Sequence, residues 1–251
     1  MSKIDLNCDL GESFGAYRIG MDEEVIPYVT SANVACGFHG GDPMVMARTV
    51  KLCRENRVHI GAHPGLPDLM GFGRRNMTLK PEEAKAYVQY QIGALKAFCD
   101  GAGLRLNHVK PHGALYNMAG KDYDLARAVC EAVRAVDKTL VLLALSGSQM
   151  IRAAEDTGLP YASEVFADRG YQADGSLVPR TMPGAMIEDE DYAVGRVIRM
   201  AKEGTVTAVD GTEISIQADS VCVHGDSPKA LAFVQRIRGA LEKAGVEVQA
   251  F

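Results

Sequence analysis

Four of the six histidines in this 251-residue chain stand beside a glycine or proline at the end of an apolar run. They are His39, His63, His112 and His224. Each run is typical of a β-strand that ends in a tight turn before a helix. In a barrel or an open sheet of βα units, the carboxyl ends of the strands meet on one face, where ligands bind. We therefore expect the four imidazoles to converge on one site.

The first strand-like segment adds carboxylates to this site. Asp5, Asn7 and Asp9 alternate with apolar residues, so their side chains share one face of the strand. We interpret Asn7 and Asp9 as the lip of a polar pocket and place Asp5 deeper. Glu12 is a second carboxylate near Asp9, and two carboxylates in different environments can divide acid and base work. Asn33, in the next strand, is a further candidate contact for substrate.

Asp9, His39 and His63 have the residue types of a divalent-metal site, because carboxylate oxygen and imidazole nitrogen are common metal ligands. They come from three separate strand ends, so their spacing adds no support. Two alternatives stay open: direct contact of these side chains with substrate, and histidines that only bond backbone carbonyls.

The segment after the fourth strand contains Lys110, His112 and Asn117. A lysine that points into a barrel mouth is costly unless it faces an anion. We therefore predict that Lys110 recognises a carboxylate or phosphate and that Tyr116 and Asn117 supply further hydrogen bonds; a surface lysine is the alternative. Asp9, Glu12, His39, Lys110 and His112 are the predicted catalytic residues.

Arginines follow the sixth strand. Arg169 and Arg180 are candidates to hold a carboxylate or phosphate through two parallel hydrogen bonds. The alternative is a salt-bridged collar in which Arg169 pairs with Glu164 or Asp168. His224 ends the last strand as a further binding candidate.

Strand-like and helix-like segments alternate through the chain. The expected strands are Ile4–Cys8, Ser31–Cys36, His59–Ala62, Arg105–Val109, Leu140–Leu145, Tyr161–Phe166 and Ser220–Val223. The expected helices are Pro43–Asn56, Pro81–Ala102, Asp122–Val136, Ser148–Thr157, Asp189–Glu203 and Pro228–Ala244. Seven strand–helix units in series predict a parallel sheet.

Residues that could take part in catalysis or binding follow at least five of the strands. This favours a closed barrel over an open sheet, because every strand end of a barrel reaches the same mouth. We predict an α/β fold, an irregular (β/α) barrel of about seven parallel strands in a single domain over residues 1–251. Thr205–Ala218 reads as an inserted hairpin around Asp210-Gly211. Two long loops, Pro64–Thr78 and Ala167–Pro183, are candidates for a lid or a substrate clamp.

The composition and net charge limit the kinds of molecule that this protein is expected to bind. Hydrophobic residues make up 47% of the chain and charged residues 24%, values of an ordinary globular core. A net charge of −5 argues against a nucleic-acid surface. No apolar run approaches the ~18 residues of a membrane span, and the amino terminus lacks the apolar segment of a signal peptide. We expect a cytoplasmic protein with a small-molecule substrate.

Six sequence blocks together resemble the 5-oxoprolinase A-subunit family, also called the LamB/YcsF group. They are Asp5-Leu-Asn-Cys-Asp-Leu-Gly-Glu12, Ala32-Asn-Val-Ala-Cys-Gly-Phe-His-Gly-Gly-Asp-Pro43, Gly61-Ala-His-Pro64, Val109-Lys-Pro-His-Gly-Ala-Leu-Tyr-Asn117, Glu164-Val-Phe-Ala-Asp-Arg-Gly-Tyr171 and Cys222-Val-His-Gly-Asp226. The blocks run from the first strand to the last, so the resemblance extends over the length of one such subunit.

The resemblance implies an ATP-dependent hydrolase that opens the lactam of 5-oxo-L-proline to L-glutamate. It also implies two partner subunits similar to allophanate-hydrolase components. The implied fold is the irregular (β/α) barrel of the polysaccharide-deacetylase superfamily, whose Asp-His-His metal site would fall on Asp9, His39 and His63.

Two other functions stay open at this point. One is a metal-dependent deacetylase or amidohydrolase that acts without ATP. The other is a non-catalytic subunit that binds 5-oxoproline and delivers it to a partner. The sequence contains neither a P-loop pattern nor a Gly-x-Gly-x-x-Gly pattern, so no common nucleotide-binding motif marks where ATP would bind.

Overall fold

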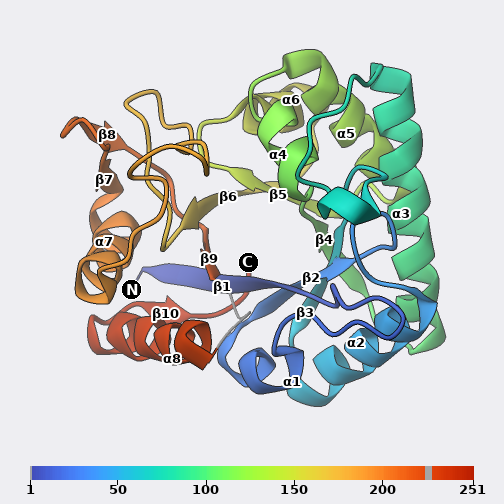
Figure 1. Cartoon of the computed structure of the whole chain (residues 1–251), viewed down its shortest axis with the longest axis horizontal. Coiled ribbons are helices and arrows are strands. Elements are labelled where there is room, and N and C mark those ends of the chain that lie inside the picture. The colour runs from blue at the N-terminus through green and yellow to red at the C-terminus, as the bar shows by residue number, and fades with distance from the viewer. Residues whose placement is uncertain (1, 224–227) are drawn as a thin grey trace.

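The computed structural model describes residues 2–223 and 228–251. Parallel strands close into a barrel, in which the last strand pairs back to the first (Figure 1). In order around the barrel they are β1 (Lys3–Leu10), β2 (Ser31–Ala35), β3 (His59–His63), β4 (Leu106–Val109), β5 (Val141–Leu145), β6 (Tyr161–Phe166) and β9 (Ser220–Val223). The prediction of an irregular seven-stranded (β/α) barrel is confirmed, with each strand within two residues of its expected bounds.

Helices cover the outside of the barrel. The six predicted helices are present as α2 (Pro43–Asn56), α3 (Pro81–Gly101), α5 (Tyr123–Val136), α6 (Gln149–Thr157), α7 (Glu190–Glu203) and α8 (Pro228–Lys243). Their starts follow the sequence signals: the Asp42 carboxylate, for example, accepts hydrogen bonds from the amides of Met44 and Val45 at the start of α2. Within the described residues, no helix combines the length and the apolar character that a membrane crossing needs.

Several short elements were not predicted. They are α1 (Asp22–Val25), α4 (Gly113–Ala119), the 3-10 turns η1 (Ile26–Tyr28) and η2 (Leu69–Gly71), and strand β10 (Glu247–Val248), which pairs with β1. The important one is α4, since it presents side chains to the barrel mouth. Its seven residues are too few to show a helical periodicity in the sequence, and no side chain caps its start.

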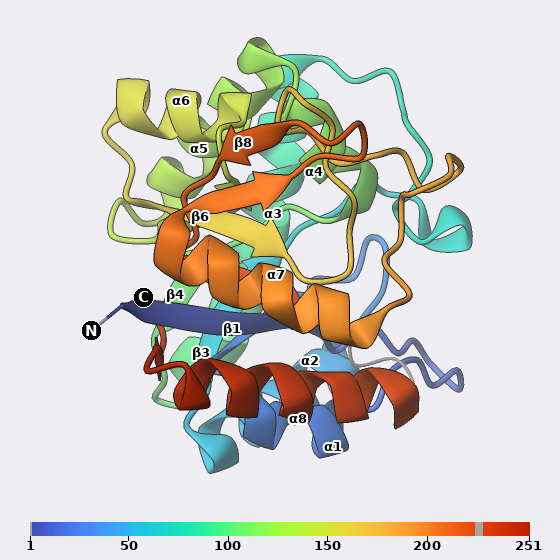
Figure 2. The ribbon, with the colours of Figure 1, turned by 90° about the vertical axis from the view of Figure 1, so that its left-hand side faces the viewer.

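The predicted hairpin is confirmed as β7 (Thr205–Thr207) and β8 (Glu213–Ser215), an antiparallel pair separate from the barrel. Figure 2 shows this hairpin with α7 and α8 on one side of the molecule. The two long loops follow β3 and β6, as expected. Both reach the carboxyl ends of the barrel strands, where they help to line a cavity.

The inside of the barrel is unusually polar. Barrel interiors are normally filled by branched apolar side chains. Here the fully or nearly fully buried polar residues on the barrel strands include Asp5, Asn7, Ser31, Asn33, His108, Glu164 and Ser220. Because a buried polar group is costly unless it is hydrogen-bonded, this interior must be a connected network.

Candidate active site

A cavity of about 1070 Å³ opens at the carboxyl ends of the strands. Its inner end is formed by Asp9, His63, Lys110 and His112. Its outer walls come from the two long loops and from the segments that begin α4 and α6. The cationic residues of the lining, apart from Lys110, are Arg74, Arg75, Lys121, Arg169 and Arg180. A basic wall around a polar inner end suits small anionic ligands.

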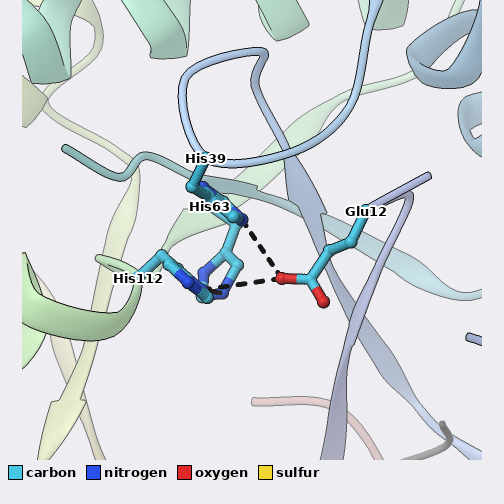
Figure 3. Close-up of side chains that lie close together, drawn as sticks. All are labelled: Glu12, His39, His63 and His112. Atoms are coloured by element: carbon cyan, nitrogen blue, oxygen red, sulfur yellow. Dashed lines mark hydrogen bonds and ion pairs between the residues drawn. The ribbon is translucent and has the colours of Figure 1, made fainter. Parts of the chain in front are cut away.

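Three of the four predicted histidines converge on one carboxylate (Figure 3). Glu12 follows β1, His39 lies between β2 and α2, His63 ends β3 and His112 follows β4. One ligand atom from each lies within 4.8 Å of all the others. His39 Nε2 is 3.1 Å from Glu12 Oε1, and the rings of His39 and His112 stack with their centroids 3.6 Å apart. We call these four residues the histidine cluster.

Backbone carbonyls fix the protons of two rings in this cluster. His63 Nδ1 donates to the Lys110 carbonyl oxygen at 2.6 Å, and His112 Nε2 donates to the Phe72 carbonyl oxygen at 2.9 Å. A carbonyl only accepts, so both nitrogens carry hydrogen. The other two nitrogens, His63 Nε2 and His112 Nδ1, face each other at 2.9 Å. In neutral rings both present lone pairs, so the space between them requires a proton or a metal cation.

The surroundings favour the neutral rings. Burial, together with the neighbouring rings of His39 and His63, holds the pKa of His112 well below its usual value. Burial and His63 lower the pKa of His39 in the same way. Burial raises the pKa of Glu12, although His112 opposes the shift. Extra protons on the His39 and His112 rings are therefore disfavoured, and either a proton shared with His63 or a divalent cation would satisfy the facing lone pairs.

The donor set fits such a cation. Metal–nitrogen bonds of ~2.0–2.1 Å place neighbouring ligand atoms about 2.9 Å apart at right angles and about 3.4 Å apart in a tetrahedron. The separations of 2.9 Å between His63 and His112 and 3.1 Å between His39 and Glu12 lie in this range. The predicted metal set of Asp9, His39 and His63 shares two members with the cluster. The third, Asp9, lies beside it, with Oδ2 3.3 Å from His63 Nε2.

Asp9 is held as a carboxylate with a fixed orientation. Its Oδ1 accepts hydrogen bonds from Asn33 Nδ2 at 2.9 Å and Lys110 Nζ at 3.1 Å, which turns Oδ2 towards His63. Burial alone would raise the pKa of Asp9, but His63 and Lys110 outweigh it and keep the pKa well below its usual value. Asp9 is therefore ionised at neutral pH, with one oxygen facing the cluster.

Lys110 meets anions of the protein itself. Its ammonium is 2.7 Å from Glu164 Oε1, 3.1 Å from Asp9 Oδ1 and 3.1 Å from Asn7 Oδ1. Burial would lower its pKa, but Asp9, Cys222 and Glu164 raise it well above the usual value. The expectation of an anion beside Lys110 is met by these side chains, and Glu164 pairs with Lys110 rather than with Arg169.

The two predicted asparagines form a layer beneath the site. Asn33 Nδ2 donates to Asn7 Oδ1 at 2.7 Å, and His108 Nε2 donates to Asn33 Oδ1 at 2.8 Å. Burial lowers the pKa of His108 to about 3, so its ring is neutral. Asn7 and Asn33 are fully buried, do not line the cavity, and orient Asp9 and Lys110 from below.

The remaining predicted residues lie on the cavity wall or outside the described chain. Asn117 is exposed on α4 and donates to the Gly113 carbonyl. Arg169 is buried, and its guanidinium donates to the carbonyls of Val178 and Ala185, which braces the loop after β6. Arg180 lines the cavity, and His224 lies outside the described residues.

Sequence reasoning missed His108 as part of the site, expected only an unspecified hydrogen bond from Tyr116, and left Glu164 as one member of a collar. His108 and Lys110 stand two apart on and just after β4, the spacing of side chains that share one face of a strand. That alternation is a signal that could have placed His108 inside the barrel. Tyr116 lies on the unpredicted helix α4 and donates its hydroxyl to Glu164 Oε2 at 2.6 Å.

Gly61 makes room for the His108 ring. A Cβ atom at position 61 would lie 2.0 Å from His108 Nε2, closer than atoms can approach. We expect Gly61→Ala to lower the free energy of unfolding by about 3 kcal/mol, the upper range for overpacking a core. Urea unfolding measures this change. Gly93→Ala, in an open position on α3, should be neutral or stabilising, and equal effects of the two changes would contradict the steric account.

Comparisons with known proteins agree with the fold and with the sequence blocks. The LamB/YcsF family model matches residues 4–251. The chain is 61% identical over 248 residues to the 5-oxoprolinase A-subunit of Clostridium beijerinckii, and the match covers 99% of this chain and 97% of that protein. It is 58% identical over 250 residues to the same-named protein of Bacillus subtilis, covering 100% and 97%.

Among solved structures, the lactam utilization protein of Thermus thermophilus superimposes with a TM-score of 0.94 at 51% identity, covering 99% of this chain and 100% of that one. An Enterococcus faecalis protein described as a putative cellobiose-phosphate cleavage protein has a TM-score of 0.59 at 15% identity over 99% of this chain and 97% of that one, which shows a shared fold alone. The matches at high identity extend over almost the whole chain, so this protein belongs to the LamB/YcsF family.

Proposed function

We propose that this chain is the component of a cytoplasmic 5-oxoprolinase that opens 5-oxo-L-proline to L-glutamate at the expense of ATP, together with two further subunits. The observation that carries the proposal is the 61% identity, over 99% of the chain, to a protein named as the A-subunit of 5-oxoprolinase. The histidine cluster and Asp9, at the inner end of a basic cavity, supply groups suited to hydrolysis of an amide.

The chemistry explains the need for ATP. A lactam carbonyl is a poor electrophile because its amide is resonance-stabilised. Transfer of a phosphoryl group to the lactam oxygen would give an imidate phosphate, whose ring carbon water can attack. Water then adds to that carbon, and the ring C–N bond breaks as the nitrogen takes a proton, which leaves an acyl phosphate. A second water hydrolyses this acyl phosphate to glutamate and inorganic phosphate. The cavity must therefore hold a phosphoryl group and a carboxylate while a base removes a proton from water.

Asp9 is the proposed base. It is ionised, and its Oδ2 faces the histidine cluster rather than its hydrogen-bond donors. Glu12 would serve as the second carboxyl group for proton transfer, and the imidazoles of His39 and His112 would hold it in place, with ring nitrogens 3.1 Å and 3.6 Å from its Oε1. Where a divalent cation is bound, Glu12, His39, His63 and His112 would hold it, and it would supply Lewis-acid polarisation at the cavity's inner end.

We assign the binding of the substrate carboxylate or of phosphate to the outer wall of the cavity. Lys110 already contacts two protein carboxylates, so it has little capacity to take a third anion. Arg169 and Arg180 both line the cavity, and Arg180 lies close enough to Arg169 to contribute, after burial, to the lowered pKa of its guanidinium. Two like charges beside one cavity are stabilised by a bound carboxylate or phosphate. Asn117, at the edge of the same wall, would add a hydrogen bond.

Reconstitution tests the proposal. The purified chain is mixed with its two partner subunits, 5-oxo-L-proline and ATP, and the formation of glutamate and ADP is measured. We expect both products to form together, and only when 5-oxoproline is present. ATP turnover that ignores 5-oxoproline, or no turnover by the complete complex, would reject the assignment.

A metal-dependent amidohydrolase that needs no ATP is the second candidate. The facing lone pairs of His63 and His112 favour it, because they suit a bound cation. Incubation of the zinc-loaded chain with N-acetylated sugars, without ATP, separates the two candidates. Release of acetate under these conditions would support the second function, and strict dependence on ATP and 5-oxoproline would support the first.

A further inference from the structure

We propose that Glu164 and Tyr116 are positioning residues that fix Lys110 and, through it, the orientation of Asp9. The inference rests on the proposed function, in which Asp9 acts as the base. Neither residue needs to touch substrate for this role. Glu164 lies within the barrel wall on β6 and is fully buried, and Tyr116 reaches it from α4.

The two oxygens of Glu164 face different partners, one through an ion pair and one through a hydrogen bond. Oε1 is 2.7 Å from Lys110 Nζ, and Oε2 accepts the Tyr116 hydroxyl hydrogen at 2.6 Å. These contacts leave the Glu164 carboxylate one orientation. The Tyr116 hydroxyl comes from α4, the Lys110 ammonium from the end of β4, and the Glu164 carboxylate from β6. Their contacts therefore join three separate elements at the inner end of the cavity.

The shared ammonium fixes the position of Asp9. Lys110 Nζ lies closer to Glu164, at 2.7 Å, than to Asp9, at 3.1 Å. Without the Glu164 charge, Asp9 is left as the carboxylate that attracts Lys110, whose other hydrogen bonds go to the uncharged Asn7 amide and Cys222 thiol. Lys110 would then draw Asp9 away from His63. Glu164 therefore holds Lys110 in place and so keeps the Asp9 Oδ2 directed at the cluster.

A role in folding alone explains this arrangement poorly. Burying an ion pair usually stabilises a protein less than well-packed apolar side chains of the same volume. The barrel nevertheless gathers two carboxylates and an ammonium where apolar residues normally pack. Lys110 and Tyr116 also line the cavity, so the arrangement lies at the site of chemistry.

Glu164→Gln and Tyr116→Phe test the inference in the reconstituted complex, since each keeps the size of the side chain. We expect kcat to fall roughly 10- to 100-fold, the cost of misplacing a catalytic group by about 1 Å. We expect KM for 5-oxoproline to change less than about 2-fold, because neither residue contacts substrate. If Tyr116 acts through Glu164, the double variant should be no slower than Glu164→Gln alone.

The chain offers a matched control pair. The Tyr161 hydroxyl donates to Glu155 Oε1 at 2.7 Å, a similar bond on an exposed face. Tyr161→Phe and Glu155→Gln should leave kcat unchanged. A rise in KM with kcat intact would overturn the inference and give Lys110 a direct contact with substrate. If the losses of kcat in the double variant are additive, Tyr116 acts independently of Glu164, and the positioning role of Tyr116 is overturned.

A crystal structure of Glu164→Gln supplies a readout that does not depend on activity. We expect the separation of Lys110 Nζ from Asp9 Oδ1 to shorten from 3.1 Å, and that of Asp9 Oδ2 from His63 Nε2 to lengthen from 3.3 Å. An unmoved Asp9 would overturn the positioning role, even in a protein whose wild type turns over 5-oxoproline. Failure of the wild-type complex to turn over would instead overturn the proposed function.

Discussion

Asp9→Asn should reduce kcat by about 10³-fold, within the range of general-base catalysis. Asparagine has nearly the size of aspartate, and its Oδ1 can still accept from Asn33 and Lys110. Its Nδ2 takes the place of Oδ2 and can donate to the lone pair of His63 Nε2, so no buried polar atom is left without a partner. The change therefore removes the charge and the basic oxygen while it keeps the shape of the site. Glutamate formation by the reconstituted complex is the measurement.

Asp100→Asn is the matched control for this variant. Asp100 pairs with Lys96 on the exposed surface of α3, so it tests the loss of an Asp–Lys pair away from the cavity, and its kcat should be unchanged. Binding of 5-oxoproline to Asp9→Asn should persist, because Asp9 is assigned to the chemical step. A variant that retains more than about a tenth of the wild-type kcat would contradict the role of Asp9 as base. Lost turnover with retained binding would exclude a chain that only delivers substrate.

Periodic features of the sequence account for the successful predictions. Alternating strands and helices predict parallel strands, and the ends of parallel strands must meet at one mouth. His39, His63 and His112 therefore converge even though they are far apart in the chain. The same logic places Asp9 and Glu12 with them, since both stand at the end of β1.

Contacts across the barrel account for what the sequence could not predict. Lys110 was expected to meet an anion, but whether that anion belongs to the protein depends on the distance between β4 and β6. Glu164 lies in a short apolar run, and no pattern shows that its side chain points inward. Tyr116 reaches it from α4, a helix too short for its period to be recognised. Such pairings depend on barrel diameter and strand register rather than on local sequence.

The charges at the inner end of the cavity do not balance. Asp9, Glu12 and Glu164 are three carboxylates, and Lys110 is the ammonium that Asp9 and Glu164 share. The neighbouring imidazoles of His39 and His112 are held neutral by burial. Net negative charge in a buried site is costly unless a cation compensates it, so a divalent ion at the histidine cluster would resolve both this imbalance and the facing lone pairs.

His63→Gln should therefore weaken binding of Zn²⁺ or Co²⁺ by roughly 100-fold or more, since loss of even an outer-shell partner costs about 10–100-fold. Isothermal titration of the chain alone should find one strong site in the wild type. Zinc at about 100 times its Kd should also raise the free energy of unfolding by about 2.7 kcal/mol. The variant should lose this stabilisation.

His59→Gln is the control, because His59 begins β3 at the opposite end of the barrel from His63 and belongs to no metal-binding group among the described residues. Its metal affinity should match the wild type. Equal weakening by both changes would mean that the ion binds the exposed surface. No strong site in the wild type would mean that a proton, shared between His63 and His112, separates the facing nitrogens. The cluster would then act through hydrogen bonds alone, and the ATP-independent amidohydrolase would lose its main support.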